Sequence, residues 1–403
     1  MPLVSVPVIE NLPNNVAFSR ASAAWSHSLT GTLQQSLADK ARIDFDPATL
    51  EARCLLIESE RINSLRNSAC SGAVAGTLGS GGAVPTNWII SGLLGGVNIS
   101  VSAPGSEDGM PYLDLTFAGS GSGTFSLGFE ATTFIAASSS QTWTASAYYR
   151  LISGSLANAS LIHKVVERNS GGGTLVSGDI SINPDAAALH TQRPSVTRTF
   201  NNASTAWTNA RLDVIAAGAV NFTLRIGAPQ LERGGHASSP IITTGSAALR
   251  AADIGLVQPV APWFNQAAGT FFVEWERPAA IVASGILAEF NDGTFNNRVT
   301  LEIIDGKLRA HQFLGGASPG YLERAAPDGI GRVAFAWGGG SRALASSASS
   351  SLATDTANLG AIPADRLWLG CQNNNSACLN GWLRRIQYSH QRKSDDDLLA
   401  LVA

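Results

Sequence analysis

Short segments in which apolar and polar residues alternate are the feature of this chain that most restricts its fold. In the stretch TWTASAYYR, alternate positions place one set of side chains on a single face of an extended strand, namely Trp143, Ala145, Ala147 and Tyr149. The residues between them fall on the opposite face. This two-residue period is that of a strand. Because 41 of the 403 residues are glycine, turns between such strands are readily made.

Strand-like segments recur toward the C-terminus, with turn residues between them. The clearest are Asn221–Ile226, Thr270–Trp275, Arg298–Ile304, Arg332–Trp337, Arg366–Gly370 and Gly381–Tyr388. Asp305-Gly306 predicts a tight hairpin between two of them. A helix is predicted only near the end of the chain, where Ser394 can cap an acidic first turn followed by leucines. We therefore predict an all-β protein with two jelly-roll-type β-sandwiches after an irregular N-terminal segment.

The composition divides the chain into three parts. They are an N-terminal segment (residues 1–75), a middle sandwich (76–245) and a C-terminal sandwich (246–403), separated by stretches rich in glycine, serine or proline. Because long irregular segments are rare inside compact domains, the N-terminal segment either wraps another domain or docks onto a partner. Leu55, Leu56 and Ile57 have no evident place in a self-contained sandwich. We therefore expect the sandwiches to stay soluble when residues 1–70 are deleted.

Charge and hydropathy exclude several classes of protein. The net charge of −3 argues against non-specific binding of nucleic acid, which needs a basic excess. No apolar run reaches the roughly 18–20 residues of a membrane helix, and the first residues lack the pattern of a secretory signal, so we expect no membrane insertion. Four cysteines are too few for a disulfide framework. Four free thiols in a reducing cytosol are the simplest expectation, with a bond between Cys371 and Cys378 left open.

Catalytic motifs are weak in this sequence, and we expect no enzyme. Glycosidases place two carboxylates across the bond that they cleave. Glu274 and Glu276 share one strand face, but Pro278 stands where a further acid would be needed. The sequence contains neither HExxH nor GxSxG. A Ser–His–Asp triad assembles in space and stays open, although nothing favours one.

Metal binding is also weakly indicated. No cofactor is expected, while a structural calcium ion is left open because carboxylates lie near predicted turns. These carboxylates are Asp108, Asp114, Asp292 and Asp305. No run of residues defines a site, and turn formation explains Asp292-Gly293 and Asp305-Gly306 equally well.

Candidate sugar-binding residues are aromatic side chains expected outside the cores, since an exposed ring can stack on a pyranose. Tyr148 and Arg150 lie on the strand face opposite Trp143, and Trp88 follows a polar loop. These three residues are our glycan-binding candidates, and Tyr148 with Arg150 would suit an acidic sugar. The alternative for Tyr148 is packing against a neighbouring domain or subunit.

Three resemblances rest on particular motifs. The segments Ala268–Trp275, Arg332–Trp337 and Leu379–Tyr388, with the helix after them, make the C-terminal part similar to the laminin-G-like form of the concanavalin A-like lectin fold. The middle part resembles carbohydrate-binding-module sandwiches through Trp143–Tyr148, Ala206-Trp207 and Ile226–Gly234. The N-terminal part resembles a segment of many phage virion proteins through Phe18–Ser22, Arg42–Pro47, Leu55–Glu58 and Arg61–Asn63. A glycine usually precedes the Leu-Leu-Ile-Glu piece, and Cys54 occupies that position here.

Together the resemblances imply a structural protein of a tailed-phage virion or phage-derived particle: a tail fibre, baseplate component or head spike. It would contact other virion proteins through the N-terminal segment and bind host surface polysaccharide, and a homotrimer or other homo-oligomer is implied. Its expected location is the virion, assembled in the host cytoplasm. Two alternatives stay open: a purely structural decoration or baseplate component without a glycan site, and a polysaccharide depolymerase.

Overall fold

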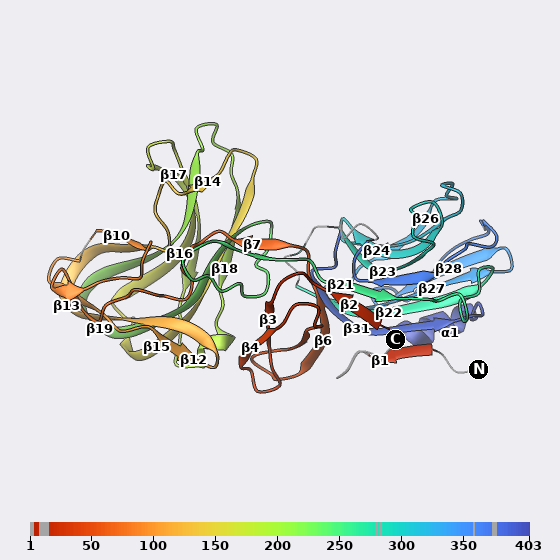
Figure 1. The fold of residues 1–403 in the computed structure, drawn as a ribbon, viewed down its shortest axis with the longest axis horizontal. Helices are drawn as coiled ribbons and strands as arrows, with labels where there is room; N and C mark the ends of the chain where they lie inside the picture. Colours follow the sequence, from red (N-terminus) through yellow and green to blue (C-terminus); the bar gives the residue numbers. More distant parts are fainter. Residues whose placement is uncertain are drawn as a thin grey trace.

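The protein is all-β, with two jelly-roll-type sandwiches joined by the N-terminal segment (Figure 1). The computed structural model describes residues 4–7, 16–92, 94–278, 281, 284–357, 359–372 and 377–403. In these ranges the helices are α1 (Asp395–Val402) and the 3-10 turn η1 (Leu189–Thr191). Ser394 and Asp397 form the capping box of α1, which confirms the predicted helix. None of the described helices is long and apolar enough to span a membrane.

The middle sandwich is built on one continuous hydrogen-bonded sheet. Its strands are β8 (Gly76–Leu78), β9 (Gly81–Gly82), β10 (Ile89–Ser91), β11 (Val97–Val101), β12 (Gly105–Glu107), β13 (Met110–Gly128), β14 (Ile135–Ala136), β15 (Thr142–Ser155), β16 (Ala159–Arg168), β17 (Thr174–Ile182), β18 (Ser195–Thr199) and β19 (Trp207–Arg233). The long antiparallel pair β13 and β19 lies at the centre of this sheet. Both strands are long enough to contribute side chains to both layers of the sandwich.

The C-terminal sandwich consists of two sheets. One has the order β29-β28-β27-β22-β31-β6-β5, with β1 also paired to β31; the other has the order β2-β21-β30-β23-β24-β25-β26. The strands are β1 (Val4–Pro7), β2 (Val16–Ser19), β5 (Ile43–Phe45), β6 (Ala52–Ile57), β21 (Ile254–Val257), β22 (Gly269–Arg277), β23 (Gly285–Asn291), β24 (Arg298–Ile304), β25 (Lys307–Phe313), β26 (Tyr321–Ala325), β27 (Gly329–Gly338), β28 (Ser341–Ser346), β29 (Ala353–Asp355), β30 (Arg366–Leu369) and β31 (Gly381–Ser389).

Two short pairs complete the structure. The hairpin β3 (Ala24–His27) and β4 (Leu33–Ser36) belongs to the N-terminal segment, and β7 (Arg61–Asn63) pairs with β20 (Ala248–Arg250) between the sandwiches. In Figure 1 the hairpin lies between the two sandwiches, next to strand β6 of the C-terminal sandwich.

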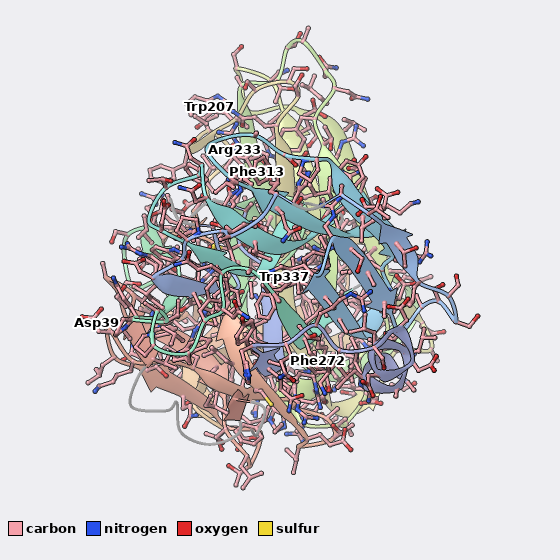
Figure 2. The ribbon with its side chains drawn as sticks, turned by 90° about the vertical axis from the view of Figure 1, so that its right-hand side faces the viewer. Asp39, Trp207, Arg233, Phe272, Phe313 and Trp337 are labelled. Atoms are coloured by element: carbon pink, nitrogen blue, oxygen red, sulfur yellow. A yellow bond between two sulfur atoms is a disulfide. The ribbon has the colours of Figure 1, made fainter. Side chains whose placement is uncertain are left out.

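Each sandwich has its own apolar core, as the alternation predicts. Trp143, Ala145, Ala147 and Tyr149 are all buried in the middle core. In the C-terminal core Trp337 lies between the two sheets, within a group of aromatic rings (Figure 2). The hairpin at Asp305-Gly306 is also confirmed, with φ values of 50° and 70°.

Strands of the N-terminal segment complete both sheets of the C-terminal sandwich, which corrects one expectation. Strand β6 pairs with β31, and Leu55 and Ile57 are fully buried in the C-terminal core. The prediction that these residues lack a place in a sandwich is therefore wrong. Cys54 has a φ of 78°, the left-handed region that favours glycine, which explains why a glycine is usual at this position. Two options were left open for the N-terminal segment, wrapping another domain or docking onto a partner. Within this chain the segment wraps another domain.

Two cysteines are bonded and two are free. Cys371 and Cys378 form a disulfide, so the simplest expectation of four free thiols is wrong. Cys54 and Cys70 are free and buried. Burial raises the pKa of the Cys70 thiol to about 12, so this group stays protonated at neutral pH.

Candidate functional site

Two of the three predicted sugar contacts are buried. Trp88 has an exposed fraction of 6%, its indole N–H donates to the carbonyl of Asn67 at 2.9 Å, and its ring packs edge-on against Phe129. Tyr148 has an exposed fraction of 1%. The prediction that these rings form exposed stacking platforms is therefore wrong.

Tyr148 is buried because the second face of β15 is covered by residues distant in sequence. Its ring packs with Leu33, Met110, Leu189 and Ala228, of which Leu33 comes from the N-terminal segment. The alternative considered for Tyr148, packing against a neighbouring domain, is observed in part: Leu33 comes from the N-terminal segment, and the other three residues belong to the middle sandwich itself. Burial raises the pKa of its hydroxyl, which stays protonated.

Arg150, the third candidate, lies in a separate charge cluster. Its guanidinium donates to a carboxylate oxygen of Glu107 at 2.9 Å and to the carbonyl of Ala186 at 3.2 Å. Arg225 donates to the other oxygen of Glu107 and to both oxygens of Asp114. Asp114, one of the calcium candidates, is thus engaged by an arginine, and Arg150 is not grouped with Tyr148.

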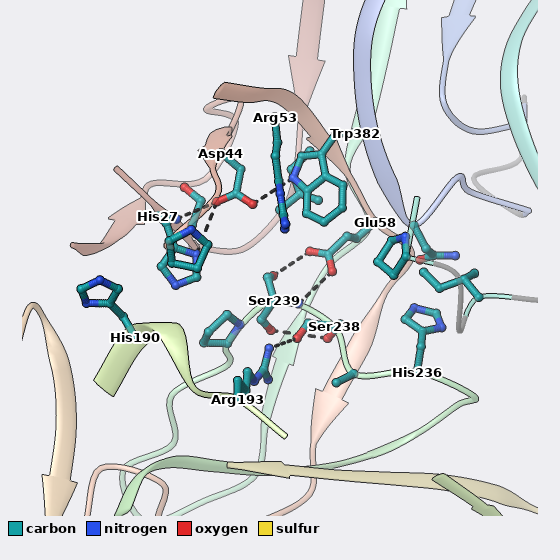
Figure 3. Close-up of a pocket in the computed structure, with 18 of the residues that line it drawn as sticks. His27, Asp44, Arg53, Glu58, His190, Arg193, His236, Ser238, Ser239 and Trp382 are labelled. Carbon is teal, nitrogen blue, oxygen red and sulfur yellow. Dashed lines mark hydrogen bonds and ion pairs between the residues drawn. The ribbon is translucent and has the colours of Figure 1, made fainter. Parts of the chain in front are cut away.

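A cavity of about 260 Å³ lies where the two sandwiches and the N-terminal segment meet (Figure 3). The N-terminal segment contributes His27, Asp44 and Glu58, among others. The middle sandwich contributes Tyr148, His190, Arg193 and the segment 236–240. The C-terminal sandwich contributes Trp382. We call this cavity the junction pocket. Tyr148 is therefore a wall residue of a pocket rather than an exposed platform.

Four buried polar atoms of residues that line the junction pocket have no hydrogen-bond partner. They are the Oγ of Ser26, the Nε2 of His27, the Nε of Arg193 and the Nε2 of His236. Ser26 and His236 are 1% and 7% exposed. Since buried polar groups in folded proteins are nearly always hydrogen-bonded, four such atoms at one cavity indicate a place where a polar ligand completes the bonding.

His236 is neutral at physiological pH. Burial, with Arg61 as the next cause, lowers the pKa of its imidazole to about 4. A neutral imidazole nitrogen can either donate or accept, so His236 can match a hydroxyl in either direction.

The acidic residues of the pocket are already bonded to protein donors. One Asp44 oxygen accepts from the backbone N–H of His27 at 2.7 Å, and the other accepts from the Trp382 indole at 2.9 Å. Glu58 accepts from the backbone N–H and hydroxyl of Ser239 and from Arg42. Both carboxylates are therefore held in position by protein donors.

A fully buried ion network lies behind Glu58 and ties the parts together. Arg42 contacts both Glu58, at 2.8 Å, and Asp253, while Arg20 contacts Asp253 at 3.0 Å. Arg250 lies 3.3 Å from Glu58. Burial alone would raise the pKa of Glu58, but Arg250 and Arg42 outweigh it and hold this pKa below its ordinary value. Glu58 is thus ionised.

The other chemical candidates have structural partners. Glu274 lies within 3.5 Å of Arg332 and Arg384, and Glu276 pairs with Arg384 at 2.9 Å. These acids are partly buried in an arginine cluster, not simply solvent-facing.

Two of the predicted turn carboxylates are also engaged within the protein. Asp108 pairs with His190 at 3.0 Å, and Asp292 accepts from Thr294 and Asn297. In the part of the chain that the structure describes, no group of three or more His, Cys, Asp or Glu residues could hold a metal ion.

Comparisons with known proteins give no family. No protein-family model matches the chain, and no curated protein matches it. Among solved structures, the chain is similar to the carbohydrate-binding module CBM40 of a Ruminococcus gnavus IT-sialidase, with 17% identity and a TM-score of 0.29 over 34% of this chain and 84% of that one.

Two further solved structures are similar at the same low level. Domains LG4-5 of the mouse laminin alpha1 chain match with 13% identity and a TM-score of 0.26, over 64% of this chain and 85% of that one. The tandem CBM22 domains of Paenibacillus barcinonensis Xyn10C match with 12% identity and a TM-score of 0.26, over 81% and 99%. Likenesses at such low TM-scores identify neither a ligand nor an activity for this chain.

Proposed function

We propose that this protein binds a carbohydrate in the junction pocket. The observation that carries the proposal is the set of unpartnered atoms of Ser26, His27 and His236. Sugar hydroxyls donate and accept hydrogen bonds at once, so a sugar ring suits a wall that offers an unpartnered serine hydroxyl and unpartnered imidazole nitrogens. The indole of Trp382 adds apolar lining, which is usual for small-ligand pockets.

Replacing His236 with phenylalanine tests the proposal. The larger apolar ring removes one polar contact and occupies pocket space, so we expect binding to fall at least about tenfold, roughly 1.4 kcal/mol. The measurement is binding to an array of purified bacterial surface polysaccharides, with positive spots titrated by calorimetry. His390→Phe, outside the pocket, is the matched control. Binding by His236→Phe that equals the control, or no binding by the unaltered protein, contradicts the proposal.

We further propose that this binding serves a virion component of a tailed phage or phage-derived particle, with no hydrolase activity. The support is the N-terminal resemblance, together with two leucines that this segment leaves exposed. Leu29 lies in the turn between β3 and β4, Leu37 directly follows β4, and their exposed fractions are 63% and 68%. Exposed leucines on the segment that resembles a particle component suit contact with another virion protein.

The double substitution Leu29→Glu with Leu37→Glu tests the virion role without disturbing either core. We expect the number of copies in purified particles, counted by quantitative mass spectrometry, to fall at least about tenfold while the unfolding midpoint barely changes, since surface changes cost little. Leu249→Glu, also exposed but on β20, serves as the control. Normal incorporation of the double variant would show that this surface makes no such contact.

A further inference from the structure

We infer that the junction pocket selects sugars that carry an anionic group, a carboxylate or a phosphate, through the guanidinium of Arg193. This inference rests on the proposed function and names its ligand class. Arg193 lines the pocket and makes no ion pair with any acid in the described part of the chain. Its Nε is buried and has no hydrogen-bond partner.

Most of the other charged side chains around the pocket have a partner of opposite charge. Arg53 pairs with Asp46 and lies 3.2 Å from Glu276. His190 faces Asp108, and Glu58 pairs with Arg42. Asp44 accepts from the His27 backbone N–H and the Trp382 indole, and the His27 ring lies 3.7 Å from it. Arg193 is the arginine of the pocket wall that makes no ion pair within the described part of the chain.

The guanidinium of Arg193 is held in a defined orientation by neutral groups. One terminal nitrogen donates to the Ser238 carbonyl at 2.6 Å and the other to the Ser146 hydroxyl at 3.1 Å. The Tyr148 ring centroid lies 5.2 Å from the guanidinium carbon. These contacts fix the group but do not neutralise it. Figure 3 shows Arg193 beside Ser238 in the pocket wall.

An anionic sugar can supply both the negative charge that Arg193 lacks as a partner and the hydrogen bonds that the unpartnered atoms lack. A guanidinium binds carboxylate and phosphate oxygens through charge-assisted bonds, which are stronger than bonds between neutral groups. The hydroxyls of the same sugar can pair with the unpartnered atoms of Ser26, His27 and His236. Arg193 would thus set the preference for an acidic ligand, while these unpartnered atoms hold the ring.

Matched monosaccharide probes test this inference on the full chain. Methyl glucoside, methyl glucuronide and glucose 6-phosphate, with the galactose equivalents, are titrated against the unaltered protein. We expect at least one acidic probe to bind at least about tenfold more tightly than its neutral partner, with a preference that declines as salt is added. The carboxylate and phosphate arms identify which anion is preferred.

Two variants assign the preference to a residue. Arg193→Gln should remove the preference and leave neutral-sugar binding measurable, whereas Arg150→Gln, which removes the same charge outside the pocket, should keep it. Equal binding of acidic and neutral probes by the unaltered protein overturns the inference but not the proposed function. If Arg150→Gln loses the preference for acidic sugars and Arg193→Gln keeps it, the inference is wrong and the anion binds at the charge cluster around Glu107. If no sugar binds, the proposed function itself fails. A circular-dichroism melt of each variant confirms that the fold is intact.

Discussion

Expressing residues 76–403 alone should give a chain whose C-terminal sandwich does not fold. Deleting residues 1–75 removes β6 and β5 from one sheet of this sandwich and β2 from the other. It takes Leu55 and Ile57 out of the core and leaves an edge of β31 unpaired. Removing one buried leucine side chain typically costs about 2–5 kcal/mol, and folded domains are stable by only about 5–15 kcal/mol. Losing a whole core strand therefore exceeds the stability available.

Solubility and the unfolding transition of the truncated chain measure this effect. Leu55→Ala in the full chain gives a graded version, with an expected loss of about 2–5 kcal/mol in the free energy of unfolding. Leu50→Ala, at an exposed turn of the same segment, is the control. A soluble 76–403 fragment with a cooperative transition of its C-terminal sandwich would show that the segment is separable, as the sequence alone suggested.

Local patterns predicted the elements, because the signals that set them are local. Trp143 to Tyr149 alternate within one strand, Asp305-Gly306 makes its own turn, and Ser394 caps the helix that begins after it. Each signal depends on neighbours a few residues away. The assignment of these strands to sandwiches rests on their number and spacing.

The candidate site could not be predicted in the same way. Thr144, Ser146 and Tyr148 have the polar character of an outer face, yet all three are buried. The cover over Tyr148 includes Leu33, more than a hundred residues away in sequence. Nothing local to β15 indicates such a cover.

The pocket residues come from separate stretches, and the residues with unpartnered atoms lie outside the sequence motifs. Ser26, Arg193 and His236 meet only because three parts of the chain converge. One signal did point to the junction. The motif pieces of the N-terminal resemblance contain Arg42 and Glu58, which prove to be residues of the buried network. A motif noted for its likeness to particle components thus also holds this chain's own sandwiches together.

Asp253→Ala should be the most destabilising single substitution at this junction. Asp253 is fully buried and contacts Arg20, Arg42 and, at 3.7 Å, Arg250. Its removal leaves three buried guanidiniums with Glu58 as their remaining acidic partner in the network. Breaking a buried ion pair by removing one partner costs about 3–5 kcal/mol, because the charge left behind is neither solvated nor paired.

The loss should appear as a lower urea midpoint, monitored by tryptophan fluorescence and circular dichroism. Asp396→Ala, at the exposed start of α1, is the control and should change stability by less than about 1 kcal/mol. Asp253→Asn separates two contributions, since it keeps an oxygen acceptor but not the charge. If the network acts through charge, the asparagine variant should lose most of the stability that the alanine variant loses. A stability of Asp253→Ala equal to that of Asp396→Ala would mean that the three arginines are satisfied by their backbone carbonyl partners, and that the junction is held by packing alone.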